Sequence, residues 1–264
     1  MSAIYIKTQE EVEKIRVSSL FVGEVLAEVA KLIEPGVSTL TLDKRAEEFI
    51  RDNTFIPAFK GYKGFPACLC ISVNEAVVHG IPNSYVLKEG DIVSIDCGIK
   101  KDGWYGDSAY TFGVGSISDE LQNLLDVTKE SLFEGINNCI VGMRIGDISN
   151  AVQVHAEKHG FSVVRELVGH GVGKRLHEEP EVPNYGKRGT GPKCQQGMVI
   201  AIEPMINIGK RNVYTKGDKW TVVTEDGKPS AHFEHTVCIM NGKADVLSSF
   251  ALIENVLKHK EITA

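Results

Sequence analysis

The hydrophobic positions in the first third of the chain follow helical spacing. Thr8 and Glu11 form a capping-box pattern just before this run, which predicts a first helix that ends at Pro35-Gly36. A shorter helical pattern covers residues 43–51. Residues 55–70 are rich in Gly, Pro and aromatic side chains, and this composition predicts a loop followed by a strand.

From residue 90 the pattern becomes that of strands. Residues 91–99 and 104–115 flank a turn at 100–103, which together predict a hairpin. A second helical pair follows, with Ser118 as the N-cap of its first helix and Gly160 after its second, over 147–159. The remaining expected elements are strands within 163–173, 198–208, 219–228 and 232–240 and a short helix near Ile253.

The order of these elements repeats. Residues 35–37 align with 141–143 at an offset of 106, and residues 90–96 align with 197–203 at an offset of 107. A nearly constant offset over about 60 residues predicts an internal duplication. We therefore expect one catalytic domain over 1–264, with pseudo-symmetric halves at approximately 10–115 and 116–245.

Length and charge narrow the class of protein. At roughly 150 residues per domain, 264 residues fit one large domain or two small ones, and the duplication favours one fused domain. The chain has 29 Lys and Arg against 35 Asp and Glu, a formal charge of −6. A chain without an excess of positive charge is not expected to bind nucleic acid or an anionic membrane through its net charge.

Targeting and redox features are those of a cytoplasmic protein. No apolar run approaches the roughly 20 residues of a membrane span, and residues 1–15 lack the apolar core of a signal peptide. The cysteines show one C-x-C and no C-x-x-C, so neither a disulfide framework nor a zinc ribbon is indicated. We expect reduced, buried thiols at Cys68, Cys70, Cys97, Cys139, Cys194 and Cys238.

Both halves place an acidic residue at the end of an apolar strand, Asp96 in the first and Glu203 in the second. Carboxylates are rarely buried unless they are paired or bound to metal. Asp96 and Asp107 are eleven positions apart across the hairpin, so an even-length connection puts them on one face, opposite or diagonal at about 5 to 8 Å. Taken alone, the hairpin favours an ordinary interpretation, in which Asp107 caps a turn and Asp96 ends a strand.

Three further residues change that interpretation. Glu203 lies inside an apolar strand, and Glu234 leads into another. His170 stands between two glycines and alone would be a loop histidine. With four strand-borne carboxylates it fits a site of hard oxygen donors and one imidazole, which favours Mn, Fe or Co and leaves Zn open. Five ligands, four of them able to bridge, indicate two ions, an arrangement typical of hydrolases.

Five segments carry a specific family resemblance, at residues 70–82, 91–112, 169–180, 197–205 and 233–237. They resemble type I methionine aminopeptidases of the pita-bread fold, in peptidase family M24, over nearly the whole chain. The resemblance implies an α+β fold, in which duplicated αβ halves share a central curved antiparallel sheet covered by helices. It also implies that the dinuclear metal ligands are Asp96, Asp107, His170, Glu203 and Glu234.

The implied reaction removes the N-terminal methionine from nascent proteins and peptides, with preference for a small second residue. A bridging metal hydroxide attacks the first peptide carbonyl, and Glu203 is the general base. His79 is implied near the scissile nitrogen and His177 near its carbonyl oxygen. The ordinary interpretation of His79 is a loop imidazole.

A methionine pocket and a cation site are also implied by the resemblance. The pocket residues, for which ordinary core packing is the alternative, are Tyr62, Phe65, Cys70, Leu176, Trp220 and, at the rim, Phe59. This chain has Phe59 and Leu176 where relatives carry cysteine and phenylalanine, and pocket width is the property these departures affect. Asn74 and Ser230 align with positions that bind a monovalent cation.

Partners and competing interpretations complete the expectations. We expect a monomer that acts on the N-termini of nascent polypeptides with transient ribosome association, without specific nucleic acid or membrane binding. Proline-cleaving relatives carry a large extra N-terminal domain, which a chain of 264 residues lacks. Type II enzymes carry a long helical insert, which is absent here because Glu203 follows His170 by only 33 positions. A metal-free binding module would have lost ligands, and a dinuclear phosphatase would leave the aromatic and sulfur-containing pocket unexplained.

Overall fold

The fold is taken from a computed structural model, which describes residues 3–263. The first helix, α1 (Gln9–Ala30), begins with the predicted capping box: the Thr8 hydroxyl accepts from the Glu11 amide, and the Glu11 carboxylate accepts from the Thr8 amide. The predicted end at Pro35-Gly36 is wrong. The amides of Leu32 and Ile33 bond to carbonyls three residues back, so the helix closes in tight turns after Ala30.

Three other helices confirm their predicted positions but not their bounds. Helix α2 (Thr39–Asp52) begins four residues earlier than predicted because Ser38 is its N-cap. Helix α3 (Asp119–Asn137) has the predicted cap at Ser118. Helix α4 (Ile145–Lys158) begins before the predicted 147, because Asp147 accepts from the Arg144 amide as its third residue. Gly160 follows with a φ of 86°, as a terminating glycine should.

The hairpin is confirmed as β4 (Ile92–Lys101) and β5 (Trp104–Gly113). Its turn is only Asp102-Gly103, and both residues have positive φ, 49° and 85°, as two-residue hairpin turns require. β4 also pairs with β1 (Ile56–Pro57) and β2 (Leu69–Val73), completing a four-stranded antiparallel sheet. A short helical turn, η1 (Tyr62–Gly64), lies between β1 and β2.

The second half forms a five-stranded sheet in the order β15-β14-β9-β7-β8. Glu203 directly follows β9 (Val199–Ile202), Glu234 directly precedes β14 (His235–Cys238), and His170 lies in β7 (Gly169–Gly171). The edges are β8 (Glu178–Val182) and β15 (Asp245–Val246). Two smaller sheets have three strands each. The first has β10 (Met205–Asn207) between β13 (Ser230–His232) and β6 (Ser162–Val163). The second has β12 (Val222–Thr224) between β11 (Val213–Thr215) and β3 (Ala76–Val78).

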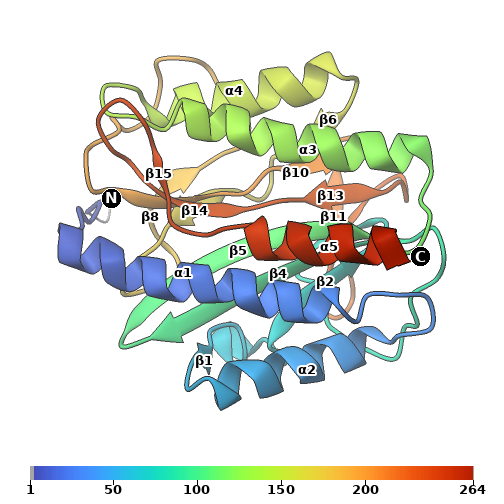
Figure 1. The fold of residues 1–264 in the computed structure, drawn as a ribbon. Helices are drawn as coiled ribbons and strands as arrows, with labels where there is room; N and C mark the ends of the chain where they lie inside the picture. The colour runs from blue at the N-terminus through green and yellow to red at the C-terminus, as the bar shows by residue number, and fades with distance from the viewer. Residues whose placement is uncertain (1–2, 264) are drawn as a thin grey trace.

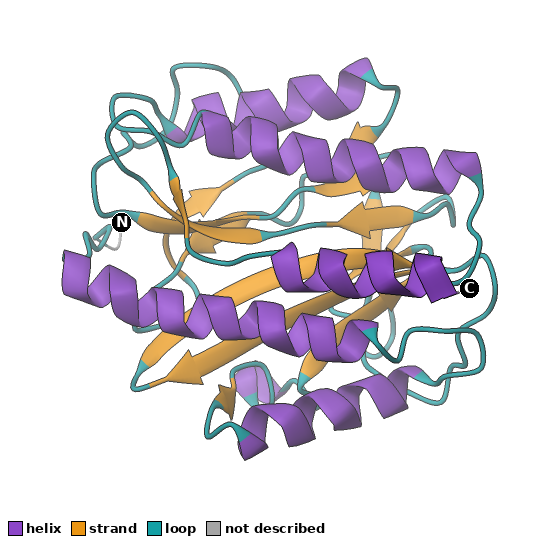
Figure 2. Cartoon of the chain, viewed as in Figure 1, coloured by secondary structure: helices purple, strands orange, loops and turns teal. Residues whose placement is uncertain are grey.

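The sheets of the two halves meet between β5 and β14. The Glu234 amide donates to the Ala109 carbonyl at 3.0 Å, and the Thr236 hydroxyl donates to the Asp107 carbonyl at 2.7 Å. In Figures 1 and 2, α1 and α5 (Ala251–Thr263) lie in front of β4 and β5, with α3 and α4 above and α2 below. The α+β class is confirmed. Among the helices of the described residues, none combines the length and apolarity needed to cross a bilayer.

Matching features occur in the two halves at the offsets of the sequence repeat. Helices α2 and α4 are both 14 residues long, and antiparallel bridges join Ser38 to Val86 and Arg144 to Lys193. The aligned glycines Gly90 and Gly197 both have left-handed backbones, with φ of 87° and 84°. The duplication stays a prediction, which these features support.

Candidate metal centre

The first two carboxylates come from the hairpin. In the register of β4 and β5, Asp96 faces Ala109 and Asp107 faces Gly98. The two acids are therefore a diagonal pair on one face, because the two-residue turn leaves an even connection, and side chains alternate along a strand. Both are held by strands whose other face is buried among apolar residues.

The other three candidate ligands come from the five-stranded sheet. Glu203 directly follows β9, and Glu234 directly precedes β14, whose His235 is paired with Ile202. The backbone bond from Glu234 to Ala109 brings Glu234 alongside β5. His170 is the middle residue of β7, and no side chain stands on either neighbouring residue to crowd its ring.

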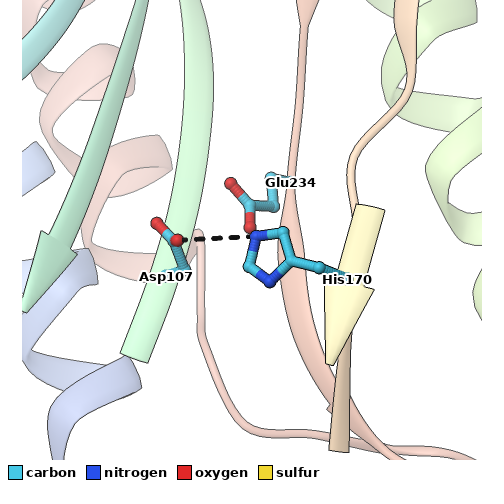
Figure 3. Close-up of side chains that lie close together, drawn as sticks. All are labelled: Asp107, His170 and Glu234. Atoms are coloured by element: carbon cyan, nitrogen blue, oxygen red, sulfur yellow. Dashed lines mark ion pairs between the residues drawn. The ribbon is translucent and has the colours of Figure 1, made fainter. Parts of the chain in front are cut away.

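These side chains converge on one point. Ligand atoms of Asp107, His170 and Glu234 lie within 4.8 Å of one another. Figure 3 shows their side chains directed toward each other from three separate segments, with the Asp107 and His170 ion pair dashed. The His170 Nε2 lies 3.5 Å from Glu203 Oε1 and 3.9 Å from Asp107 Oδ2.

Electrostatics show that all four acids share this space. Burial raises the pKa of Asp96 to about 7. Burial and the charges of Glu234 and Asp96 raise the pKa of Asp107 far above its usual range. The pKa of Glu203 is raised by burial and by Asp96 and Asp107, and that of Glu234 by burial and by Glu203 and Asp96. So many adjacent buried carboxylates need protons or cations between them.

The donor atoms fit metal ions. Within the described residues, Asp96 Oδ1, Asp107 Oδ1 and Glu234 Oε1 are buried without a hydrogen-bond partner, a costly state unless a cation is bound. The Nδ1 of His170 lies 3.0 Å from the Gly171 carbonyl, which fixes the proton on Nδ1 and leaves the Nε2 lone pair facing the acids. Burial lowers the pKa of His170 to about 4, so its ring is neutral at pH 7.

A cavity of about 300 Å³ opens onto these ligands. His79 and His177 both line it, and both sit beside the carboxylates rather than among them. The ring of His177 lies 4.2 Å from that of His170 and stacks on Tyr62 at 5.3 Å. His79 has a φ of 57°, a left-handed backbone that is uncommon for residues other than glycine and that clusters at functional sites.

The predicted pocket residues all lie in the wall of this cavity. They form one buried apolar cluster, in which Phe65 meets Trp220 edge to face at 5.2 Å. The cluster contains Phe59, Tyr62, Phe65, Cys70, Leu176 and Trp220. The two interpretations of Phe59, rim and core packing, therefore both apply, because the ring is 7% exposed and also lines the cavity.

Asn74 and Ser230 lie together but outside the cavity wall. The Ser230 amide donates to the Asn74 carbonyl at 2.9 Å, and the Ser230 hydroxyl donates to the Ile206 carbonyl at 3.2 Å. The Asn74 side chain donates to Asp91 and accepts from the Ile92 amide. These bonds join the turn between β2 and β3 to β4, β10 and β13.

Several cavity residues were absent from the sequence expectations. Met205 is fully buried and follows Glu203 by two positions, so the Glu-Pro-Met sequence was an available indication. The others in the wall are Lys63, Val78, Glu166, Leu167 and Val168. His232 is also buried near the site, with Nε2 at 3.9 Å from Glu203 Oε2, and its place two positions before Glu234 could have indicated it.

Comparison with known proteins identifies what this architecture is similar to. A profile of metallopeptidase family M24 matches residues 13–241. The methionine aminopeptidase of Clostridium perfringens is 51% identical over 245 residues, covering 93% of this chain and 98% of that protein. Methionine aminopeptidase 1 of Bacillus subtilis is 52% identical over 245 residues, covering 93% and 99%.

Solved structures agree with the sequence comparison. The crystal structure of methionine aminopeptidase from Thermotoga maritima matches with a TM-score of 0.92 and 45% identity, covering 94% of this chain and all of that one. Prolidase from Pyrococcus furiosus matches with a TM-score of 0.75 at 23% identity and with 66% of its own length, which shows a shared fold alone.

Proposed function

The chain belongs to metallopeptidase family M24, and from that premise we propose that Asp96, Asp107, His170, Glu203 and Glu234 hold two divalent metal ions. The protein is a metal-dependent aminopeptidase that removes the N-terminal methionine of its substrates. The observation that carries the ligand assignment is the set of buried carboxylate oxygens left without partners beside the Nε2 of His170. Hard oxygen donors with one imidazole suit Mn, Fe, Co or Zn.

When bound, the ions supply Lewis acidity and a water whose pKa is lowered toward neutrality. We assign the proton transfers to Glu203. Its carboxylate lies in the cavity wall, with one oxygen 3.5 Å from Nε2 of His170 and the other 3.9 Å from Nε2 of His232, a place from which it can accept a proton from water and return it to the leaving amine. We assign the free α-amine of the substrate to one of the ions or to the side of Asp96, which would explain the removal of a single residue.

The two histidines are assigned to the scissile peptide, His79 at its nitrogen and His177 at its carbonyl oxygen. His177 is exposed on one side, but desolvation against the cavity wall and the nearby His170 lower its pKa to about 3, so the ring is neutral at pH 7. A neutral imidazole still offers one N–H, and a donor aimed at the developing oxyanion stabilises the transition state more than the ground state.

The methionine side chain is assigned to the cluster around Phe65 and Trp220. This pocket is apolar and contains the Cys70 thiol, and burial raises the pKa of Cys70 so that it stays a neutral, polarisable group. A small second residue of the substrate is preferred in this proposal. Asn74 and Ser230 are assigned to a monovalent cation.

The cellular setting is proposed with the activity. The enzyme acts as a monomer in the cytoplasm on the N-termini of nascent polypeptides, with transient docking on the ribosome. Exposed basic pairs, Lys187-Arg188 and Lys210-Arg211, are the surface groups suited to such docking.

The test is peptide hydrolysis by protein reconstituted with Mn²⁺, Fe²⁺, Co²⁺ or Zn²⁺. A Met-Ala-Ser peptide should release methionine, and a peptide of the same sequence with an acetylated amine should be inert because the α-amine anchor is missing. Native mass spectrometry should show two ions per chain. Cleavage of phosphate esters without cleavage of the peptide would overturn the proposal.

A further inference from the structure

Lys7, in the segment before α1, has its side chain buried in the interior of the protein. The Lys7 side chain is 1% exposed, and its Nζ donates to Glu178 Oε2 at 2.9 Å across 171 positions of sequence. Lysine is almost never this buried without a partner. The backbone of Lys7 is fixed on both sides, because its amide donates to the Gly197 carbonyl at 2.8 Å and Thr8 caps α1. In Figure 1, the short segment that leads into α1 lies near β8, whose first residue is Glu178.

The Glu178 carboxylate accepts a second hydrogen bond, from the backbone of the preceding loop. Its Oε1 accepts from the Arg175 amide at 3.1 Å, while Oε2 accepts from Lys7. Glu178 is the first residue of β8 and pairs with Gly171 of β7, so it closes the connection between the two strands. We call residues 173–177 the His177 loop. A Cβ on Gly173 would lie 2.6 Å from Oε1, so the loop wraps directly around this carboxylate.

The His177 loop carries two residues of the cavity wall. Leu176 is 1% exposed within the apolar cluster, and His177 stacks against Tyr62 and His170. The start of the loop is tied to β5 by the bond from the Tyr105 amide to the Gly173 carbonyl. Two hydrogen bonds hold the turn just before Leu176: the Arg175 amide donates to Glu178, and the Gly173 amide donates to the Arg175 carbonyl at 3.2 Å.

We propose that Lys7 is a positioning residue for the active site: its ion pair holds Glu178 against the Arg175 amide, and this keeps Leu176 and His177 directed into the cavity. A buried carboxylate without the ammonium would protonate or turn toward water. In either case its hold on Arg175 weakens. The inference rests on the proposed role of His177, and it adds a contribution from the N-terminal segment, which contains none of the site residues.

The test compares Lys7→Met, which keeps an unbranched apolar side chain one atom shorter and removes the charge, with Lys14→Met. Lys14 pairs with Glu10 at 2.7 Å on the exposed face of α1, so this control removes a lysine ion pair that has no contact with the loop. If Lys7→Met does not fold, Lys7→Met/Glu178→Gln is measured instead, because it leaves no unpaired charge in the interior.

Hydrogen exchange of the peptide containing Arg175 is the first readout. We expect the Arg175 amide to exchange about tenfold faster in the Lys7 variant, with β4 and β5 unchanged, and the Lys14 control to match the wild type. Trypsin gives a second measure, because Lys174 and Arg175 are exposed at the tip of the loop and cleavage there should accelerate. Unchanged exchange in the folded Lys7 variant would overturn the inference.

Steady-state kinetics on a Met-Ala-Ser peptide are the final readout. We expect kcat to fall about tenfold with two metal ions still bound, since a displaced catalytic group costs rate and none of the five proposed ligands lies within residues 173–177. Faster exchange with an unchanged kcat would overturn the link to catalysis. An inactive wild-type enzyme would instead contradict the proposed function, and the exchange result would still report whether Lys7 holds the loop.

Discussion

The Nδ1 of His177 lies 3.0 Å from the hydroxyl of Tyr62, on which the imidazole is stacked. Because the ring is neutral, a hydroxyl that donates to Nδ1 places the ring proton on Nε2. Nε2 then becomes the donor available to a substrate. We infer that the Tyr62 hydroxyl is the donor in this contact, an arrangement that would select the tautomer needed by the proposed oxyanion contact. Tyr62 also forms part of the pocket wall.

Replacing His177 with alanine should lower kcat by about 10², the typical cost of one oxyanion donor. Metal content should stay at two ions, because His177 is not among the five proposed ligands. Tyr62→Phe keeps the stacked ring and removes only the hydroxyl, so its kcat should fall less than that of His177→Ala. An unchanged rate in His177→Ala would reduce this histidine to a packing role.

Replacing Asp107 with asparagine should abolish metal binding where the side chains of Asp107, His170 and Glu234 meet. Asparagine has nearly the same shape but carries no charge, and loss of the bound cation should cost about 10³-fold or more in rate. Asp102→Asn is the matched control, since Asp102 lies exposed in the turn of the same hairpin. Elemental analysis of the purified variants decides the matter, and two retained ions in Asp107→Asn would show the ligand assignment to be wrong.

The metal-free protein should lose stability as pH rises from 6.5 to 8. The pKa of Asp96 is about 7 when folded and roughly 3.9 when unfolded, so the folded state holds more protons and its advantage disappears as pH rises through 7. Glu203 and Asp107 face Asp96 and act with the same sign. His170 opposes them, but its contribution is lost only as pH falls below about 6.5, the unfolded value.

Thermal unfolding of protein dialysed against EDTA measures this effect. The unfolding temperature should fall between pH 6.5 and 8, and Mn²⁺ should restore it by replacing protons with cations. Asp96→Asn should flatten the curve. A metal-free protein whose stability rises over this range would show that the carboxylates are not crowded as described.

Much of the site was predictable because its chemistry is local in sequence. The hairpin length put Asp96 and Asp107 on one face, and strand-borne acids at Glu203 and Glu234 are unusual enough to stand out. Helix bounds were less predictable. Ser38 caps α2 five residues before the predicted helical pattern starts, so the pattern and the capping hydrogen bond indicate different first residues.

Other contacts could not be inferred because they join distant segments. Lys7 and Glu178 are both ordinary charged residues in the sequence, and only folding shows that they are buried against each other. The same holds for Leu167 and Val168, whose place in the cavity wall depends on how the chain enters β7. The width of the pocket, left open by Phe59 and Leu176, also depends on such a contact.

That contact joins Phe59 to Gly98. A Cβ on Gly98 would lie 2.4 Å from Cε1 of Phe59, so the ring rests directly on the backbone of β4. Gly98 is two positions after Asp96 and therefore faces the same side, the side of the cavity. Gly98→Ala should lift the ring into the pocket and raise KM for a Met-Ala-Ser peptide about tenfold, the scale of one misplaced methyl group in an apolar pocket.

Gly113→Ala is the control, because it adds a methyl group to the same hairpin at the far end, where the neighbouring Ile117 side chain can yield. Its KM should match the wild type. Gly98→Ala/Phe59→Leu should recover the wild-type KM, since leucine leaves room for the new methyl group. If Gly98→Ala left KM unchanged while lowering the unfolding temperature, Phe59 would be a core residue whose ring moves away from the cavity.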